Sequence, residues 1–188
     1  LLRFAEHAKC PVINALTNTY HPSQALGDLF TLYERLPTLQ DQRFVFVGDA
    51  NNVARSLAIA AAATGMHFVL VGPREYWFDD PFTDQLQATY PQAQLQQTTE
   101  LDALAGASVV YTDVWTSMGF ESESEQRSVS LHPYQVDQRA MQIAGEQALF
   151  MHCLPANRNQ EVTDDVIDSP NSIVIEQAAN RLHLQKAL

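Results

Sequence analysis

The sequence contains little cysteine, little positive charge and no long apolar run, and each shortage argues against a class of protein. Its two cysteines, Cys10 and Cys153, lie far apart, so they build no disulfide framework, and no C-x-x-C spacing indicates a zinc site. No apolar run approaches the roughly 18 residues that a membrane span needs. The 11 basic residues face 22 acidic ones, and the resulting net charge of −11 argues against free nucleic acid as a partner.

The start of the chain lacks a methionine and also lacks the basic region and uninterrupted apolar stretch of a signal peptide. The missing methionine favours a chain that begins inside a longer one. The missing signal-peptide features favour a cytoplasmic protein. The 188 residues predict about one domain, because domains average roughly 150 residues. A content of 46% hydrophobic and 18% charged residues is typical of a globular protein.

Short apolar runs alternate with helical patterns along most of the chain. Runs that are apolar throughout indicate strands buried on both faces, and strands separated by helices pair in parallel through right-handed crossovers. The pattern therefore predicts an α/β fold with a doubly wound, Rossmann-like parallel sheet flanked by helices. The expected strands are 44–47, 68–71, 108–111, 148–151 and 172–175, with a weaker one at 94–97; the expected helices are 52–64, 80–90, 136–144 and 176–188, with single turns at 101–104 and 162–167.

The first 36 residues depart from this rhythm. They contain a short helical pattern, a strand-like run at 11–16 and a helix from Pro22 to Arg35, with the proline in the first turn, where it fits best. We interpret residues 1–36 as the tail of a preceding unit plus a connecting helix. Residues 37–175 would then form the α/β domain, and 176–188 a closing helix that packs back toward the preceding unit.

Four polar clusters lie where such a fold places its ligand site. Doubly wound sheets bind ligands at the carboxyl ends of their strands. Three clusters follow predicted strands at 48–52, 113–119 and 152–155, and the fourth lies at the start of a helix at 21–24. A dinucleotide site is not indicated, because Gly48 lacks the other glycines of the G-x-G-x-x-G fingerprint. The helix start at 51–52 could still bind a carboxylate through its free N–H groups.

The clusters after the later strands also have ordinary structural interpretations. Asp113 and Ser117 are typical helix caps, although together they could hold an ammonium group. Cys153 fits a small buried hydrophobe, and His152 fits a core histidine. Adjacent strand residues point to opposite faces of a sheet, so His152 is a poor base for a Cys153 nucleophile.

Two further features have both a structural and a functional interpretation: the helix start at 21–24 and the arginine of the last helix. His21 and Gln24 either face solvent at a capped helix start or present their side chains to an oxyanion or carbonyl group. Arg181 is a surface arginine unless a ligand recruits it.

Taken together and in this order, the clusters resemble those of the ornithine carbamoyltransferases. The Ser-Met-Gly and His-Cys-Leu-Pro elements resemble the ornithine branch of that family rather than the aspartate or acetylornithine branch. The resemblance covers essentially the whole chain. The matching elements are His-Pro-Ser-Gln at 21–24, Gly-Asp-Ala-Asn-Asn at 48–52, Asp-Val-Trp-Thr-Ser-Met-Gly at 113–119, His-Cys-Leu-Pro at 152–155 and Asn-Arg at 180–181.

The resemblance implies a role for each matching residue. The ornithine ligands would be Asn52, Asp113, Ser117 and Met118, with Cys153 and Leu154 next to the attacking δ-amine. The carbamoyl phosphate ligands would be His21, Gln24 and Arg181, together with Cys153 and Leu154. The catalytic residues would be Asp113, Cys153 and Arg181, and neither a metal ion nor an organic cofactor is implied.

The reaction implied is transfer of a carbamoyl group from carbamoyl phosphate to the δ-amine of L-ornithine, giving L-citrulline and phosphate. The resemblance connects the reaction to arginine biosynthesis, although catabolic ornithine enzymes share these motifs, and implies a homotrimer or a multiple of trimers. The charge and the lack of a long apolar run favour no nucleic acid or membrane partner. The nucleophile must be a neutral amine, and deprotonating an amine with a pKa near 10.4 costs about 4.6 kcal/mol at pH 7. A site that excludes water reduces this cost.

The chain also departs from the family pattern. Ser23 replaces a usual Cys or Thr, and Ala179 replaces the Glu that usually precedes Asn-Arg, which leaves the placement of Arg181 open. The Ser-Thr-Arg-Thr loop of the carbamoyl phosphate domain occurs nowhere in the chain. We therefore expect the carboxyl-terminal, ornithine-binding half of the enzyme, inactive by itself. Two alternatives stay open: a non-catalytic amino-acid-binding or interaction module, and a carbamoyltransferase for a related amine.

Overall fold

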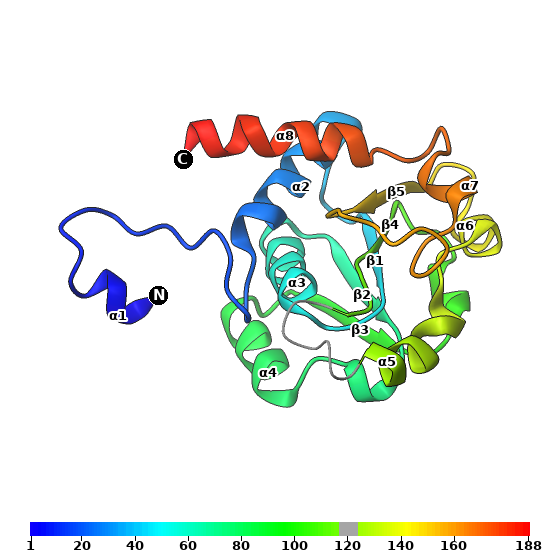
Figure 1. Ribbon diagram of the computed structural model, residues 1–188, viewed down its shortest axis with the longest axis horizontal. Coiled ribbons are helices and arrows are strands. Elements are labelled where there is room, and N and C mark those ends of the chain that lie inside the picture. Colours follow the sequence, from blue (N-terminus) through cyan, green and yellow to red (C-terminus); the bar gives the residue numbers. More distant parts are fainter. Residues whose placement is uncertain (117–123) are drawn as a thin grey trace.

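A computed structural model describes residues 1–116 and 124–188 and shows a five-stranded parallel sheet with the strand order β3-β2-β1-β4-β5 (Figure 1). This confirms the predicted α/β class. Each expected strand up to residue 152 is present, including the weak one at the edge of the sheet. The strands are β1 Arg43–Val47, β2 His67–Val71, β3 Gln94–Thr98, β4 Val109–Thr112 and β5 Leu149–His152.

Helices cover both faces of the sheet, because the central strands are apolar at nearly every position and alternate residues point to opposite faces. Phe44 and Phe46 of β1 belong to the core beneath α2 (Pro22–Arg35), α3 (Asn52–Thr64) and α4 (Asp80–Thr89). Val45 and Val47 belong to the core on the other face, beneath η2 (Leu101–Leu104), α6 (Gln138–Ala144) and α7 (Asp164–Ile167). The remaining described helices are α1 (Leu2–Ala5), η1 (Arg74–Tyr76), α5 (Ser124–Leu131), η4 (His132–Tyr134) and α8 (Val174–Ala187).

The two ends of the chain are placed differently (Figure 1). Helix α8 runs along α2 at one side of the molecule, and the segment containing α1 extends away from the body (Figure 1). The strand-like run at 11–16 has no strand pairing among the described residues. None of the described helices combines the length and apolar character required to span a membrane.

The strand predicted at 172–175 is wrong, and the last helix begins two residues earlier than expected, at Val174. Ser172 makes only an isolated parallel bridge to Phe150 at the outer edge of β5. Ile173 and Val174 are buried because they begin α8 against the core. A short run of buried apolar residues fits a strand or a helix start equally well, so periodicity could not separate them.

Helix α5 was missing from the sequence prediction, and α6 begins at Gln138 rather than at Val136. Val136 instead forms an isolated parallel bridge with Val162, and Asp137 caps α6 by accepting a hydrogen bond from the N–H of Ala140. The turn expected at 162–167 is present as α7.

Two glycines allow the carboxyl ends of β1 and β2 to lie close together. Gly48 follows β1 with φ of 138°, a backbone conformation that other residues rarely adopt. A Cβ atom at Gly72 would lie 2.3 Å from the carbonyl oxygen of Gly48. The single glycine of the 48–52 cluster therefore has a structural purpose in the turn between β1 and α3.

Candidate functional site

A cavity of about 740 Å³ opens at the carboxyl ends of the strands and receives residues from all four polar clusters and from α8. We call it the carboxyl-edge cavity. Its formation follows from the strand register, in which Val47 lies beside Thr112 and Thr112 beside His152. The residues that come next in each strand therefore emerge together. The predicted site residues that line the cavity are His21, Gln24, Asn52, Asp113, Cys153, Leu154 and Arg181.

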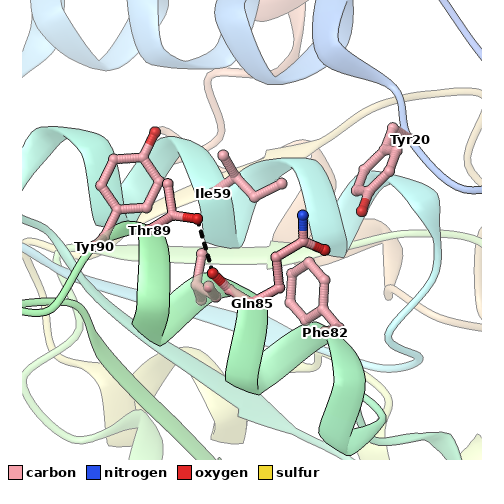
Figure 2. A pocket seen from close by; sticks show the side chains of 7 residues that line it. Tyr20, Ile59, Phe82, Gln85, Thr89 and Tyr90 are labelled. Carbon is pink, nitrogen blue, oxygen red and sulfur yellow. Dashed lines mark hydrogen bonds between the residues drawn. The ribbon is translucent and has the colours of Figure 1, made fainter.

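A smaller cavity of about 170 Å³ lies between α3 and α4 (Figure 2). It is lined by Tyr20, Ile59, Phe82, Gln85, Leu86, Thr89 and Tyr90, none of which belongs to the four polar clusters. The lining contains no carboxylate, cationic side chain or thiol. The chemistry expected from the sequence is therefore concentrated in the carboxyl-edge cavity.

Asp113 is held in the carboxyl-edge cavity by three hydrogen bonds. Its Oδ1 accepts from the N–H of Val114 at 2.7 Å and from Sγ of Cys153 at 2.8 Å. Its Oδ2 accepts from Nδ2 of Asn51 at 2.7 Å. Asp113 caps no described helix, so its alternative interpretation as a helix cap is not supported. A carboxylate has about four acceptor positions, which leaves Oδ2 able to accept a further donor.

Asn51 links this carboxylate to the start of α3. Its Oδ1 accepts hydrogen bonds from the N–H groups of Val53 and Ala54, both at 3.0 Å, so Asn51 is the N-cap of the helix. One amide side chain therefore caps α3 with its oxygen and orients Asp113 with its nitrogen. The adjacent Asn52 also lines the cavity, but its Nδ2 donates to the carbonyl oxygen of Thr17 at 2.7 Å.

Cys153 and His152 have different surroundings, as expected for adjacent residues at the end of β5. Burial, together with the nearby charge of Asp113, raises the pKa of the Cys153 thiol well above its usual value. His152 is buried: its Nδ1 accepts from the N–H of Leu154 at 2.9 Å, and its Nε2 lies 3.2 Å from Oε1 of Glu161. His152 is thus a core histidine that supports the turn at Leu154, where φ is 56°.

Asp113, His152 and Cys153 also form a cluster of potential metal ligands, whose donor atoms lie within 4.8 Å of one another. Both ring nitrogens of His152 already have partners, and Cys153 donates to Asp113. These contacts favour a hydrogen-bonded cluster over a metal-ligating one.

His21, Gln24 and Arg181 line another part of the same cavity. Nη1 of Arg181, on α8, donates to Oε1 of Gln24, on α2, at 2.6 Å. Burial, with a smaller contribution from the charge of Arg181, lowers the pKa of His21, which favours a neutral imidazole at pH 7. Ala179 is exposed on α8, so Arg181 reaches the cavity through its contact with Gln24 and without help from residue 179.

The structure also adds polar residues that sequence reasoning missed. Arg127 pairs with Asp49, donates through Nε to the carbonyl oxygen of Trp115 at 2.7 Å, and lies 4.6 Å from the ring centroid of Tyr76. Asp28, on α2, is fully buried beneath Gln24. The available signal for Asp28 was its position four residues after Gln24 on one face of the helix. The predicted ligands Ser117 and Met118 lie outside the described residues.

Comparison with known proteins places these features in a family. The family description "Aspartate/ornithine carbamoyltransferase, Asp/Orn binding domain" matches residues 40–188, and "Aspartate/ornithine carbamoyltransferase, carbamoyl-P binding domain" matches residues 1–34. The ornithine carbamoyltransferase of Pyrobaculum aerophilum is 51% identical over 191 residues, which cover 100% of this chain and 62% of that protein. The chain thus spans about 62% of the length of this curated relative.

Solved structures of ornithine carbamoyltransferases have the same fold as this chain. Ornithine carbamoyltransferase from Pyrococcus furiosus superposes with a TM-score of 0.89 at 45% identity, covering 97% of this chain and 59% of that one. The enzyme from Gloeobacter violaceus gives a TM-score of 0.90 at 36% identity, covering 100% of this chain and 64% of that one. The fold, the placement of the site residues and the match over residues 40–188 lead to one conclusion: the chain belongs to the aspartate/ornithine carbamoyltransferase family.

Proposed function

We propose that this chain forms the ornithine-binding part of an enzyme that carbamoylates the δ-amine of L-ornithine, releasing L-citrulline and phosphate. The observation that carries the proposal is the carboxyl-edge cavity. It brings an amine-binding carboxylate, Asp113, within the same space as a cation, Arg181, that can bind an anionic leaving group. The names of the relatives support the choice of ornithine as substrate.

Asp113 is suited to bind the α-ammonium group of an amino acid. Asn51, Val114 and Cys153 use three of its acceptor positions and hold the carboxylate in one orientation. The remaining position on Oδ2 can accept an ammonium N–H, a charge-assisted hydrogen bond of about twice the strength of a neutral one. We propose that Asn52, Ser117 and Met118 complete the amino-acid site.

Arg181 is suited to bind the phosphate side of carbamoyl phosphate. Among the described residues it makes no ion pair, whereas the cavity arginines Arg55 and Arg127 pair with Asp79 and Asp49. A guanidinium group that donates to a neutral amide keeps its charge available for an anion. His21 and Gln24 add polar groups that can bind the carbonyl oxygen and the phosphate.

The chemistry then needs a neutral δ-amine beside the carbamoyl carbon. The amine nitrogen forms the new C–N bond, and the C–O bond to phosphate breaks with its electron pair remaining on the phosphate. The proton lost by the amine balances the charge on the departing phosphate. Cys153 and Leu154 line the cavity where the amine would attack, and a protonated Cys153 thiol adds no negative charge that would favour the ammonium form.

We further propose that the complete enzyme is a cytoplasmic homotrimer, or a multiple of trimers, in arginine biosynthesis, with small molecules as its substrates. The Ser-Thr-Arg-Thr loop expected to bind carbamoyl phosphate is not in this sequence. We therefore expect the 188-residue chain to make no citrulline by itself. Detectable synthesis by the purified chain would contradict that expectation.

The first test is whether the complete enzyme forms citrulline from ornithine and carbamoyl phosphate. The second is calorimetry, which measures the binding of ornithine and of norvaline, an amino acid that lacks the δ-amine. Asp113→Ala should abolish binding of both amino acids. Asp84→Ala, which removes an exposed carboxylate on α4, should leave binding unchanged. Turnover with another amine but not with ornithine would overturn the substrate. Amino-acid binding that is indifferent to Asp113→Ala would support a non-catalytic interaction module.

A further inference from the structure

A fully buried carboxylate lies beneath the carboxyl-edge cavity and touches three elements of the fold. Asp28, on α2, is 0% exposed. Its Oδ1 accepts from Nε2 of Gln24 at 2.8 Å and from Nε2 of Gln177, on α8, at 2.7 Å. Its Oδ2 accepts from the hydroxyl of Tyr111, on β4, at 2.9 Å. All four side chains are buried, so solvent does not compete for these hydrogen bonds.

The first consequence concerns Arg181. An amide side chain can present either its oxygen or its NH₂ group to a neighbour. Because the NH₂ group of Gln24 donates to Asp28, its Oε1 points the other way and accepts from Nη1 of Arg181 at 2.6 Å. With the amide reversed, two donors would face each other and the guanidinium would lose this contact. The carboxylate thus sets the orientation of Gln24, and Gln24 holds Arg181.

The second consequence concerns the backbone that leads to Cys153. The NH₂ group of Gln177 donates to Asp28 and also lies 3.1 Å from the hydroxyl oxygen of Tyr111. Its Oε1 therefore points to β5, where it accepts from the N–H of His152 at 3.1 Å. The same carboxylate that orients Gln24 thus also orients, through Gln177, a contact to the end of β5.

Stability alone does not explain such a residue. Burying a carboxylate is costly, and well-packed apolar residues often replace buried charges with no loss of stability. Burial raises the pKa of Asp28 to about 6, despite three hydrogen bonds that lower it. The carboxylate lies where its Oδ1 accepts hydrogen bonds from two glutamines that both reach toward the cavity.

We propose that Asp28 is a positioning residue that aligns Arg181 through Gln24 and aligns the end of β5 through Gln177. The proposal rests on the proposed function, in which Arg181 binds carbamoyl phosphate. It predicts that Asp28 controls the use of carbamoyl phosphate without touching either substrate.

The experiment compares three variants of the complete enzyme. Asp28→Ala removes the acceptors, and Asp28→Asn retains a single oxygen for the two glutamines and can donate to Tyr111. Thr31→Val is the matched control, because Thr31 is a buried neighbour on α2 that accepts a hydrogen bond from Asn180 of α8 at 3.1 Å. It breaks a contact between the same two helices without touching the chain from Asp28 to Arg181.

We expect Asp28→Ala to reduce kcat/KM for carbamoyl phosphate about 100-fold, the effect typical of misplaced binding groups. Norvaline affinity should change less than about threefold, because in the proposed site norvaline binds to Asp113 and not to Arg181. Asp28→Asn should recover most of the loss, and Thr31→Val should match the wild type. The proposal is overturned if Asp28→Ala leaves kcat/KM unchanged, or if Thr31→Val lowers it equally.

A readout without turnover separates this proposal from the proposed function. The side-chain NMR signal of Arg181 Nε–H should report a restrained guanidinium in the wild type and Thr31→Val, and an averaged one in Asp28→Ala. If the wild type makes no citrulline but this pattern holds, the proposed function fails and the positioning role stands. If the wild type makes citrulline and Arg181 is equally restrained in Asp28→Ala, the positioning role fails.

Discussion

Cys153 donates its thiol proton to Oδ1 of Asp113 over a distance of 2.8 Å, which joins the ends of β5 and β4. The two residues are 40 positions apart in the sequence. They meet because β4 and β5 pair in parallel, with Thr112 beside His152, so the next residue of each strand enters the same cavity. This bond aligns the carboxylate, and it adds to the effects of burial and of the charge of Asp113, which raise the pKa of the thiol.

The first prediction is that Cys153 reacts slowly with iodoacetamide at pH 7.5. The thiolate is the reactive form, and burial, with the charge of Asp113, raises the pKa of this thiol. Exposed Cys10 is the internal control, and it should be alkylated at least about tenfold faster. Peptide mass spectrometry over time measures both rates. Asp113→Asn should accelerate Cys153 alone, and equal rates for the two cysteines in the wild type would contradict the prediction.

The second prediction concerns the ion pair between Arg127 and Asp49, whose side chains are 5% and 18% exposed. Arg127→Met should lower the free energy of unfolding by about 3 kcal/mol, because it leaves a buried carboxylate without its cationic partner. Arg35→Met is the matched control, since Arg35 and Glu176 are both 45% exposed and such pairs contribute about 1 kcal/mol or less. Urea unfolding measures the free energy of unfolding of both variants. Equal losses of stability would show that the buried pair contributes no more than the exposed one.

The third prediction separates the two roles of Asn51. Asn51→Ala should cost about 1 kcal/mol of stability through loss of the α3 cap, and it should also weaken norvaline binding because Asp113 loses the contact to Nδ2. Asp137→Ala removes the cap of α6, away from the cavity. It should cost similar stability and leave binding unchanged. Thermal unfolding and calorimetry test this, and unchanged binding in Asn51→Ala would show that Asp113 needs no support from Asn51.

The fourth prediction concerns pH. Burial raises the pKa of Asp28 from 3.8 to about 6, although Tyr111, the two glutamines and the charge of Arg181 lower it. The folded protein therefore binds this proton more tightly than the unfolded chain. Its contribution to the free energy of unfolding is fully present below pH 3.8 and is lost as the pH rises through about 6, a change on the order of 3 kcal/mol.

Asp28→Asn removes this titration. The free energy of unfolding of the wild type, relative to Asp28→Asn, should therefore decline between pH 4 and pH 6.5 and then level off. Urea unfolding at each pH measures the difference, and taking the difference cancels the other titrating groups. Parallel curves for the two proteins would contradict the prediction.

Much of the fold was predictable because it depends on local patterns. Val45 and Phe46 lie in a run that is apolar at every position, which indicates a strand covered on both faces. Gly65, in the left-handed conformation at φ of 76°, ends α3 where the sequence predicts. Ile173 and Val174 were misassigned, because two buried apolar residues in a four-residue run carry no period that separates a strand from a helix start.

Part of the candidate site was predictable for a related reason. Asp113 and Cys153 follow predicted parallel strands, and the carboxyl ends of such strands meet at one edge. His21 and Arg181 lie outside the sheet, and only the family resemblance connected them to the site. Their convergence depends on the packing of α2 against α8.

By itself, then, the sequence determined the α/β class and the edge of the sheet where polar residues collect, because both follow from short-range periodicity. Only the tertiary structure decided what the buried polar residues do. Asp28 and Gln177 are 149 positions apart, and their hydrogen bond exists only when α2 and α8 pack together. A polar side chain in the core is stabilised by its partners, and those partners come from distant parts of the chain.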